Sequence, residues 1–137
     1  MADPVSSPRP GVSSMKVMIV DDEPAVLRTY RVLLQRVGHK IVGAASNGLE
    51  AVGLYRALLG DQRPDVVLMD HRMPLKDGVS ACREILGIDP KACVIIATAD
   101  ASIKDLAIEA GAVRFKVKPF TPAELYENLA SLDSRPR

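Results

Sequence analysis

Four short apolar runs in this sequence each end at a residue that can take part in chemistry. The runs span residues 15–20, 65–69, 93–97 and 113–117, and they lead into Asp21 and Asp22, Asp70, Thr98, and Lys118 respectively. Short apolar runs separated by helical stretches are typical of a parallel sheet, whose strands place their carboxyl ends at one edge. We therefore expect three carboxylates, a hydroxyl and an ammonium group to converge where open α/β sheets bind their ligands.

A divalent metal ion would explain all three carboxylates together. Concentrated negative charge is unfavourable unless a cation offsets it, and Mg²⁺ prefers hard oxygen ligands. We expect Asp22 and Asp70 to bind the ion directly and Asp21 to help through water. Two adjacent acids in a loop are more often solvated or helix-capping, so this prediction depends on Asp70 lying beside them.

Asp70 is the candidate nucleophile. A carboxylate can attack phosphorus to give an acyl phosphate when a metal ion offsets the incoming charge. The Thr98 hydroxyl can bond a phosphoryl oxygen, although threonine at a strand end also has good β propensity. Lys118 is a mobile cation that can reach a carboxylate or a phosphate, whereas most lysines after strands are surface residues. The Lys118–Pro119 bond is a candidate cis peptide that would aim the ammonium group inward.

An alternation of strands and helices must position these residues. The sequence predicts strands at 16–20, 40–45, 65–69, 93–97 and 113–117, and helices at 24–37, 47–60, 79–86, 102–110 and 121–132. Asn47 with Glu50, and Thr121 with Glu124, are predicted capping boxes at two helix starts. Five such strand–helix units predict a doubly wound α/β sandwich.

Size and composition narrow the class of protein. The chain has 137 residues, which suits one domain, and 47% of them are hydrophobic. Tryptophan is absent and aromatic residues make up only 4%, so the core must be aliphatic. The formal net charge of +1 is too small to attract the chain electrostatically to nucleic acid or to an anionic membrane. We therefore expect direct binding to neither.

The chain ends and the cysteines indicate simple roles. Residues 1–14 are rich in Pro and Ser and are predicted to be a disordered tail, residues 15–132 the folded domain, and residues 133–137 a frayed end. Cys82, in a helix, and Cys93, in a buried strand, are expected to be reduced core residues. No apolar run has the length of a membrane span and no leader is evident, so a cytoplasmic protein is expected.

The chain resembles the receiver domains of two-component response regulators over about residues 15–132. The motifs that carry the resemblance are Asp21-Asp22, Asp70-x-x-Met73-Pro74-x-x-Asp77-Gly78, Thr98-Ala99 and Lys118-Pro119-Phe120. Each motif is weak alone, but all four occur in order at the expected strand ends. The resemblance implies a flavodoxin-like, three-layer α/β/α fold with a five-stranded parallel sheet in the order 2-1-3-4-5.

The resemblance also implies the role of each site residue. Asp70 would accept a phosphoryl group from a histidine kinase in a Mg²⁺-dependent step. Asp21, Asp22 and Asp70 would hold the metal, together with the backbone carbonyl of Arg72. Thr98 and Lys118 would recognise the phosphoryl group. Such a domain is a phosphoacceptor in signalling and not an enzyme, although it catalyses its own phosphotransfer and dephosphorylation.

Thr98 and a new residue, Phe115, are implicated in the response to phosphorylation. By the resemblance, Thr98 and Phe115 form the switch, and the signalling face comprises the fourth helix, the fifth strand and the fifth helix. Many members carry tyrosine at the Phe115 position, so a contact through that hydroxyl is absent here. A switch by rotation of the ring remains available.

Arg72 and Asp100 flank the expected mouth of the site. They lie two residues after Asp70 and two residues after Thr98. We hypothesise that they form an ion pair across the phosphoryl group, hinder the attacking water and prolong the phosphorylated state. Two solvated loop charges are an equally good interpretation, because exposed pairs contribute little.

The partners are specified only by class. The phosphoryl donor is expected to be a sensor histidine kinase or a histidine phosphotransfer protein, and a phosphorylation-dependent homodimer is a further option. The domain could act by reversible docking, relay phosphoryl groups, or be a receiver cut from a larger regulator or hybrid kinase. The sequence does not choose among these, and it does not identify the downstream target.

Other functions of doubly wound folds fit less well. A phosphatase of the haloacid dehalogenase type needs a second acid where Arg72 stands. A flavodoxin-type phosphate loop would be repelled by the acids after the first strand. A receiver that signals by binding alone would not need the complete set of acids, hydroxyl and lysine.

Overall fold

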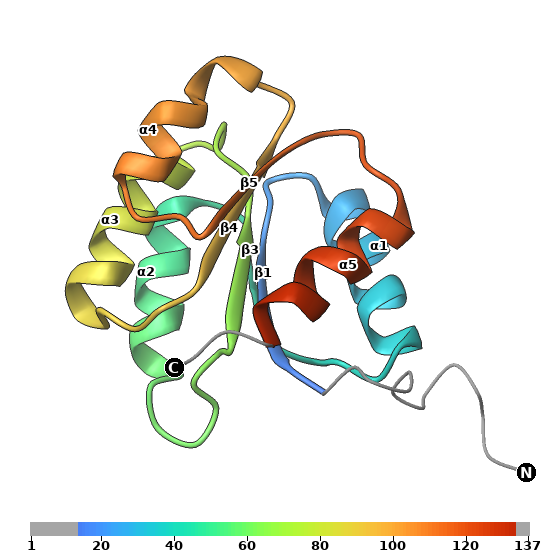
Figure 1. The fold of residues 1–137 in the computed structure, drawn as a ribbon. Helices are drawn as coiled ribbons and strands as arrows, with labels where there is room; N and C mark the ends of the chain where they lie inside the picture. Colours follow the sequence, from blue (N-terminus) through green and yellow to red (C-terminus); the bar gives the residue numbers. More distant parts are fainter. Residues whose placement is uncertain (1–13, 134–137) are drawn as a thin grey trace, which may run out of the picture.

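Five parallel strands form the central sheet of the computed structural model, which describes residues 14–133 (Figure 1). The strands are β1 Lys16–Val20, β2 Lys40–Ala45, β3 Val66–Met69, β4 Val94–Thr98 and β5 Arg114–Val117. Their order is β2-β1-β3-β4-β5, and all four neighbouring pairs are parallel. The predicted fold and strand order are therefore confirmed. The predicted tails lie outside the described residues, apart from Ser14 and from Asp133, which ends the last helix.

Helices cover both faces of this sheet. They are α1 Pro24–Arg36, α2 Gly48–Ala57, α3 Gly78–Ile88, α4 Lys104–Glu109 and α5 Pro122–Asp133, with a short 3-10 helix, η2 Ala101–Ile103, before α4. Figure 1 shows α1 and α5 on one face, and α2, α3 and α4 on the other. No helix among residues 14–133 is long and apolar enough to cross a membrane.

Burial explains which strands lie at the centre. Every residue of β3 and β4 is buried, as are four of the five residues of β1, whereas β2 and β5 are partly exposed edges. Two aliphatic clusters fill the space between the layers. One packs β-strand side chains against α2, α3 and α4, and the other packs them against α1 and α5. The largely aliphatic core predicted from composition follows from this packing, with two tyrosines, Tyr30 and Tyr55, as its buried aromatic members.

Several predicted boundaries are wrong by a few residues. The second helix ends at Ala57 and not near 60, and the third begins at Gly78 and extends to Ile88. The fourth begins at Lys104 and not at 102, after a 3-10 turn whose first amides are capped by the Asp100 carboxylate, which accepts from the Ser102 amide. Cys93 was expected within a buried strand, but it is half-buried and precedes β4. Burial of Cys82 raises the pKa of its thiol to about 11.

The two predicted capping boxes differ in the structure. In α5 the Glu124 amide donates to Thr121 Oγ1 and the Thr121 amide donates to Glu124 Oε1, both at 3.1 Å, which completes the box. In α2 the Glu50 amide donates to Asn47 Oδ1 at 2.8 Å, but Glu50 Oε1 accepts from the Ser46 amide. The capping box of α2 is therefore displaced by one residue, because the Glu50 carboxylate accepts from the amide of Ser46 and not from that of Asn47.

Leu75 adopts a positive φ of 70° in the loop between β3 and α3, with 78% of the residue exposed. A left-handed conformation costs an L-residue roughly 1–2 kcal/mol, and glycine avoids that cost. We expect Leu75→Gly to raise the free energy of unfolding by about 0.5–1 kcal/mol, net of the backbone entropy of glycine. Urea denaturation measures this difference. Leu75→Ala is the control, because alanine keeps the strain. An equal rise in both variants would contradict the argument.

Candidate functional site

The three aspartates meet at the carboxyl edge of the sheet. Val20 and Met69 are paired neighbours on β1 and β3, so the residues that follow them lie side by side. The Asp21 amide donates to the Ala45 carbonyl at 3.1 Å, and the Asp70 amide donates to the Val20 carbonyl at 3.0 Å. One carboxylate oxygen from each of Asp21, Asp22 and Asp70 lies within 4.8 Å of the others. Asp21 is fully buried and Asp22 is exposed, so the cluster opens to solvent on one side.

Backbone hydrogen bonds orient two of these carboxylates. Asp21 Oδ1 accepts from the Glu23 amide at 3.0 Å, and Asp70 Oδ1 accepts from the His71 amide at 2.7 Å. The second oxygen of each faces Lys118. The His71 ring accepts from the Val79 amide at 3.3 Å, so it holds the start of α3 and does not act on Asp70.

Lys118 supplies the cation at the centre of the acids. Its Nζ lies 2.5 Å from Asp21 Oδ2 and 3.5 Å from Asp70 Oδ2. Its backbone amide donates to the Thr98 carbonyl at 2.8 Å, and its peptide bond to Pro119 is cis. A lysine that follows the edge strand β5 therefore reaches across the sheet edge and offsets part of the charge of a buried carboxylate.

Thr98 lies at the end of β4 and is 1% exposed. Its hydroxyl oxygen accepts from the backbone amide of Asp100 at 3.3 Å. Within residues 14–133 the hydroxyl makes no hydrogen bond to the carboxylates of the three clustered aspartates. Phe115, at the other predicted switch position, lies on β5, pairs with Ile96 on β4, and packs half-buried against the core cluster on the side of α2, α3 and α4.

Arg72 and Asp100 are in contact. Arg72 Nη2 lies 2.5 Å from Asp100 Oδ2, and the Arg72 side chain is 74% exposed. Asp100 Oδ1 accepts from the Ser102 amide at 3.0 Å and from its hydroxyl. Hydrogen bonds from Ser102, and then from Arg72, lower the pKa of Asp100 below its usual value. The geometry thus contains the pair, and it joins the loop after Asp70 to the loop after Thr98.

Two further residues lie near the acids and were not predicted from the sequence to belong to the site. Burial, and then the charges of Asp21 and Asp70, raise the pKa of the Tyr30 phenol well above its usual value. Gly78 closes the motif that begins at Asp70, and an added Cβ there would lie 2.1 Å from the carbonyl oxygen of Asp70. From the sequence, only its phenol group could have pointed to Tyr30 as a site residue. For Gly78, the signal is a glycine at the start of a helix.

The donor set fits a divalent metal ion. Three carboxylates supply hard oxygens from one small volume, and the ammonium group of Lys118 already binds there as a cation. Asp21, Asp22 and Asp70 would hold the ion. The backbone carbonyl of Arg72, two residues after Asp70, remains a predicted further ligand.

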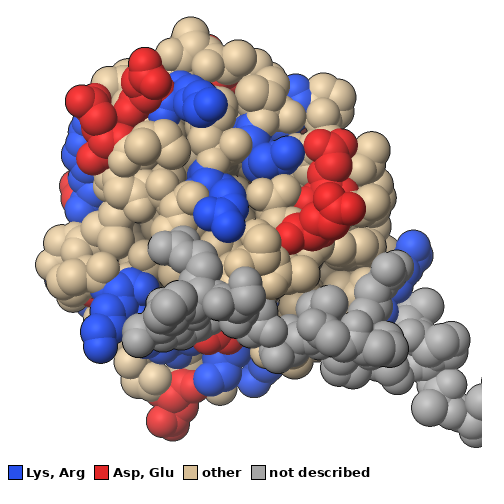
Figure 2. Space-filling model, in the orientation of Figure 1, with Lys and Arg blue, Asp and Glu red and all other residues tan. Residues whose placement is uncertain are grey.

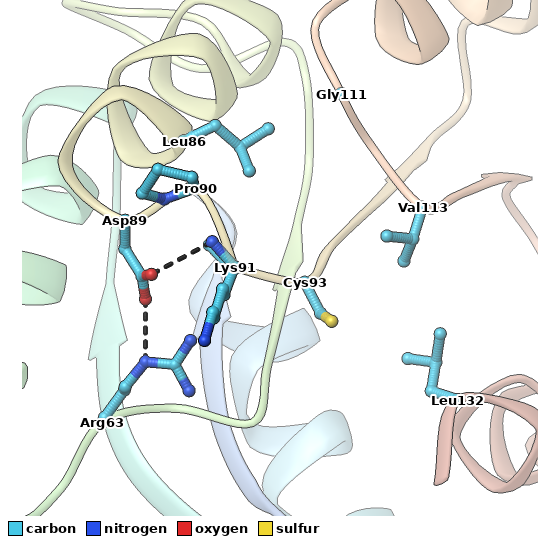
Figure 3. A pocket seen from close by; sticks show the side chains of 10 residues that line it. Arg63, Leu86, Asp89, Pro90, Lys91, Cys93, Gly111, Val113 and Leu132 are labelled. Atoms are coloured by element: carbon cyan, nitrogen blue, oxygen red, sulfur yellow. Dashed lines mark hydrogen bonds and ion pairs between the residues drawn. The ribbon is translucent and has the colours of Figure 1, made fainter. Parts of the chain in front are cut away.

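A cavity of about 700 Å³ lies at the opposite edge of the sheet, where β4 and β5 begin (Figure 3). Arg63 Nε donates to Asp89 Oδ2 at 2.8 Å, and the Lys91 amide donates to Asp89 Oδ1 at 3.1 Å. The Tyr55 hydroxyl also donates to Asp89, and these bonds lower the pKa of Asp89 although burial opposes this. Asp89 is therefore occupied in holding α2, α3 and a loop together, away from the acidic cluster.

Charges on the visible face of the molecule are mixed in sign. Figure 2 shows Lys and Arg scattered among Asp and Glu, with uncharged residues between them. The formal net charge of +1 is consistent with this distribution.

Sequence comparisons identify similar proteins. The model of the response regulator receiver domain family matches residues 17–130. The chain is 39% identical over 116 residues to the chemotaxis protein CheY of Thermotoga maritima, which covers 83% of this chain and 93% of that protein. It is 42% identical over 114 residues to Protein CcdB of Bacillus subtilis, which covers 82% and 92%.

Solved structures share the fold. The CheX–CheY–BeF3–Mg complex of Borrelia burgdorferi has a TM-score of 0.82 at 27% identity and covers 90% of this chain and 92% of that one. The receiver domain of a sensor histidine kinase from Pseudomonas aeruginosa, with magnesium coordinated in its active-site cleft, has a TM-score of 0.77 at 28% identity. It covers 89% of this chain and 100% of that one.

Proposed function

Because this chain belongs to the response regulator receiver domain family, we propose that Asp70 accepts a phosphoryl group from a histidine kinase or a histidine phosphotransfer protein in a Mg²⁺-dependent step. The domain is a signalling phosphoacceptor and not an enzyme that turns over a separate substrate. The observation that carries the proposal is the meeting of Asp21, Asp22 and Asp70 around Lys118. We further propose that the exchange takes place in the cytoplasm.

The geometry suggests how the step proceeds. An oxygen of Asp70 forms a bond to phosphorus while the bond from phosphorus to the donor imidazole nitrogen breaks and its electron pair returns to the ring. A divalent metal ion held by Asp21, Asp22 and Asp70 would offset charge on the transferring group. Asp70 Oδ1 is engaged by the His71 amide, so Oδ2, which faces Lys118, is the better attacking atom. Lys118 and the Thr98 hydroxyl then hold the phosphoryl oxygens.

A direct test uses a small-molecule donor. Incubation with acetyl phosphate and Mg²⁺ should give a single adduct with the mass of one phosphoryl group, stable in acid and labile in base, as expected of an acyl phosphate. Omission of Mg²⁺ should abolish the adduct. Failure of the native protein to form it would overturn the proposal.

Asp22→Asn should weaken Mg²⁺ binding while leaving the fold intact. Asp22 is exposed, and its side chain makes no hydrogen bond within residues 14–133. Two unit charges about 4 Å apart interact by about 1 kcal/mol in water and about 4 kcal/mol near a protein surface, so a tenfold or larger loss of affinity is expected. Calorimetric titration with Mg²⁺ measures it. Asp61→Asn, an exposed acid in another loop, is the control, and equal affinities in both variants would refute the role of Asp22.

Exposed apolar side chains on the predicted signalling face support its role in docking a partner. Leu106, Ile108 and Val117, on α4 and β5, are 47%, 49% and 43% exposed. We propose that a downstream protein docks on α4, β5 and α5, with Thr98 and Phe115 reporting the state of Asp70. The CheY of Borrelia burgdorferi was solved in complex with the protein CheX, which supports a protein target. A phosphorylation-dependent homodimer and a relay to a phosphotransfer protein are the alternatives.

Arg72 and Asp100 are proposed to slow hydrolysis of the acyl phosphate. These two side chains come from the loops that follow Asp70 and Thr98, and we propose that their bulk obstructs access of water to the acyl phosphate. We expect Arg72→Ala and Asp100→Ala each to shorten the half-life of phosphorylated Asp70 about two- to fivefold, the range of an exposed ion pair. Loss of the radiolabelled phosphoryl group over time measures the half-life. Arg56 is an exposed arginine at the end of α2, and Arg56→Ala should leave the half-life unchanged. Unchanged half-lives in all three variants would contradict the proposed role of Arg72 and Asp100.

A further inference from the structure

The carboxylate of Asp100 connects two parts of the molecule that flank the site. Oδ2 accepts from Arg72 Nη2 in the loop after Asp70, and Oδ1 accepts from the amide and hydroxyl of Ser102 at the start of η2. The Asp100 amide also donates to Thr98 Oγ1. One residue therefore caps the helix that leads into α4 and tethers it to the loop that carries the acceptor.

Arg72 is well placed to sense charge on Asp70. It lies two residues after Asp70, and within residues 14–133 its guanidinium group has one partner, Asp100. A phosphoryl group adds a charge of about −1.5 to −2 and three strong acceptor oxygens. Guanidinium groups prefer such oxygens. Two anions that share one exposed guanidinium weaken each other's hold on it.

We propose that Arg72 and Asp100 are positioning residues that couple a phosphoryl group on Asp70 to the start of η2 and α4. The inference rests on the proposed function and deepens it. Without a phosphoryl group the pair tethers η2 to the loop after β3. A phosphoryl group attracts the Arg72 guanidinium and weakens its ion pair with Asp100. The start of α4 is then free to move, in addition to any movement of Thr98. The half-life of the acyl phosphate is a separate property, because it depends on access of water.

The test uses beryllium trifluoride with Mg²⁺ as a mimic of the phosphoryl group. Asp100→Asn removes the competing charge, while asparagine caps a helix as well as aspartate does. We expect this variant to bind the mimic about two- to fivefold more tightly than the native protein, as measured by titration. Asp105→Asn, which removes one charge from the first turn of α4, is the matched control and should have a smaller effect.

A second variant separates coupling from simple repulsion. In an Arg72→Ala background no guanidinium is contested, so Asp100→Asn should change affinity no more than Asp105→Asn does. Hydrogen exchange gives an independent readout. The mimic should accelerate exchange at the Ser102 and Ile103 amides of the native protein. In Arg72→Ala, exchange there should already be fast and should not respond to the mimic.

Each outcome bears on a different claim. An unchanged affinity in Asp100→Asn, an increase that persists without Arg72, or an exchange response that survives in Arg72→Ala would overturn the coupling. A native protein that does not bind the mimic, or an Asp70→Asn variant that binds it equally well, would overturn the proposed function instead.

Discussion

Asp70→Asn should abolish phosphorylation by acetyl phosphate completely. Asparagine has nearly the shape of aspartate but lacks the negative oxygen that attacks phosphorus, and its amide cannot form an acyl phosphate. The substituted atoms take no part in the hydrogen bond from the Asp70 backbone amide to the Val20 carbonyl, or in the contact of Lys118 with Asp21. The site should therefore keep its geometry. Mass spectrometry of the intact protein in acid shows whether the adduct is present.

The controls distinguish loss of the acceptor from loss of the fold. Asp61→Asn changes the same charge in an exposed loop and should be phosphorylated as the native protein is. Asp70→Asn should be at least as stable to urea as the native protein, because it removes one of three clustered negative charges. A base-labile adduct that persists in Asp70→Asn would show that another residue is the acceptor.

Gly78→Ala should be strongly destabilising and should also displace Asp70. The new Cβ would lie 2.1 Å from the carbonyl oxygen of Asp70 and 2.9 Å from His71 Cα, and both atoms belong to the backbone. Neither can rotate away, so the loop after β3 or the start of α3 must move. Overpacking of this kind costs about 1–3 kcal/mol and sometimes more. We expect a lower urea midpoint and slower phosphorylation.

Gly87→Ala provides a control of opposite sign in the same helix. A Cβ at Gly87 would meet nothing within 4 Å, and alanine stabilises a helix interior by about 0.5–1 kcal/mol relative to glycine. Both variants add one methyl group to α3, at its first residue and at its last but one, and the surroundings of that group are crowded at Gly78 and open at Gly87. A Gly78→Ala protein as stable as the native one, with normal phosphorylation, would show that the loop yields without cost.

Much of the fold was predictable because local signals agree with the tertiary structure. The apolar runs before Asp21, Asp70 and Lys118 are strands, since strand burial in a parallel sheet leaves a continuous apolar signature. Helix ends were less predictable. Asp100 caps a 3-10 turn before the fourth helix by a side-chain hydrogen bond that apolar periodicity does not encode.

The sequence by itself determined which chemical groups stand at the strand ends, and the resemblance of their motifs determined the family. Only the tertiary structure decided how these groups pair. Lys118 meets Asp21 although 97 positions separate them. For Arg72 and Asp100, 28 positions apart, the structure shows the ion pair that the sequence left as one of two interpretations. Such contacts depend on strand order, register and side-chain conformation together, and none of these is written in the spacing of apolar residues. For the same reason, the sequence did not show that Gly78 packs closely against the backbone of Asp70.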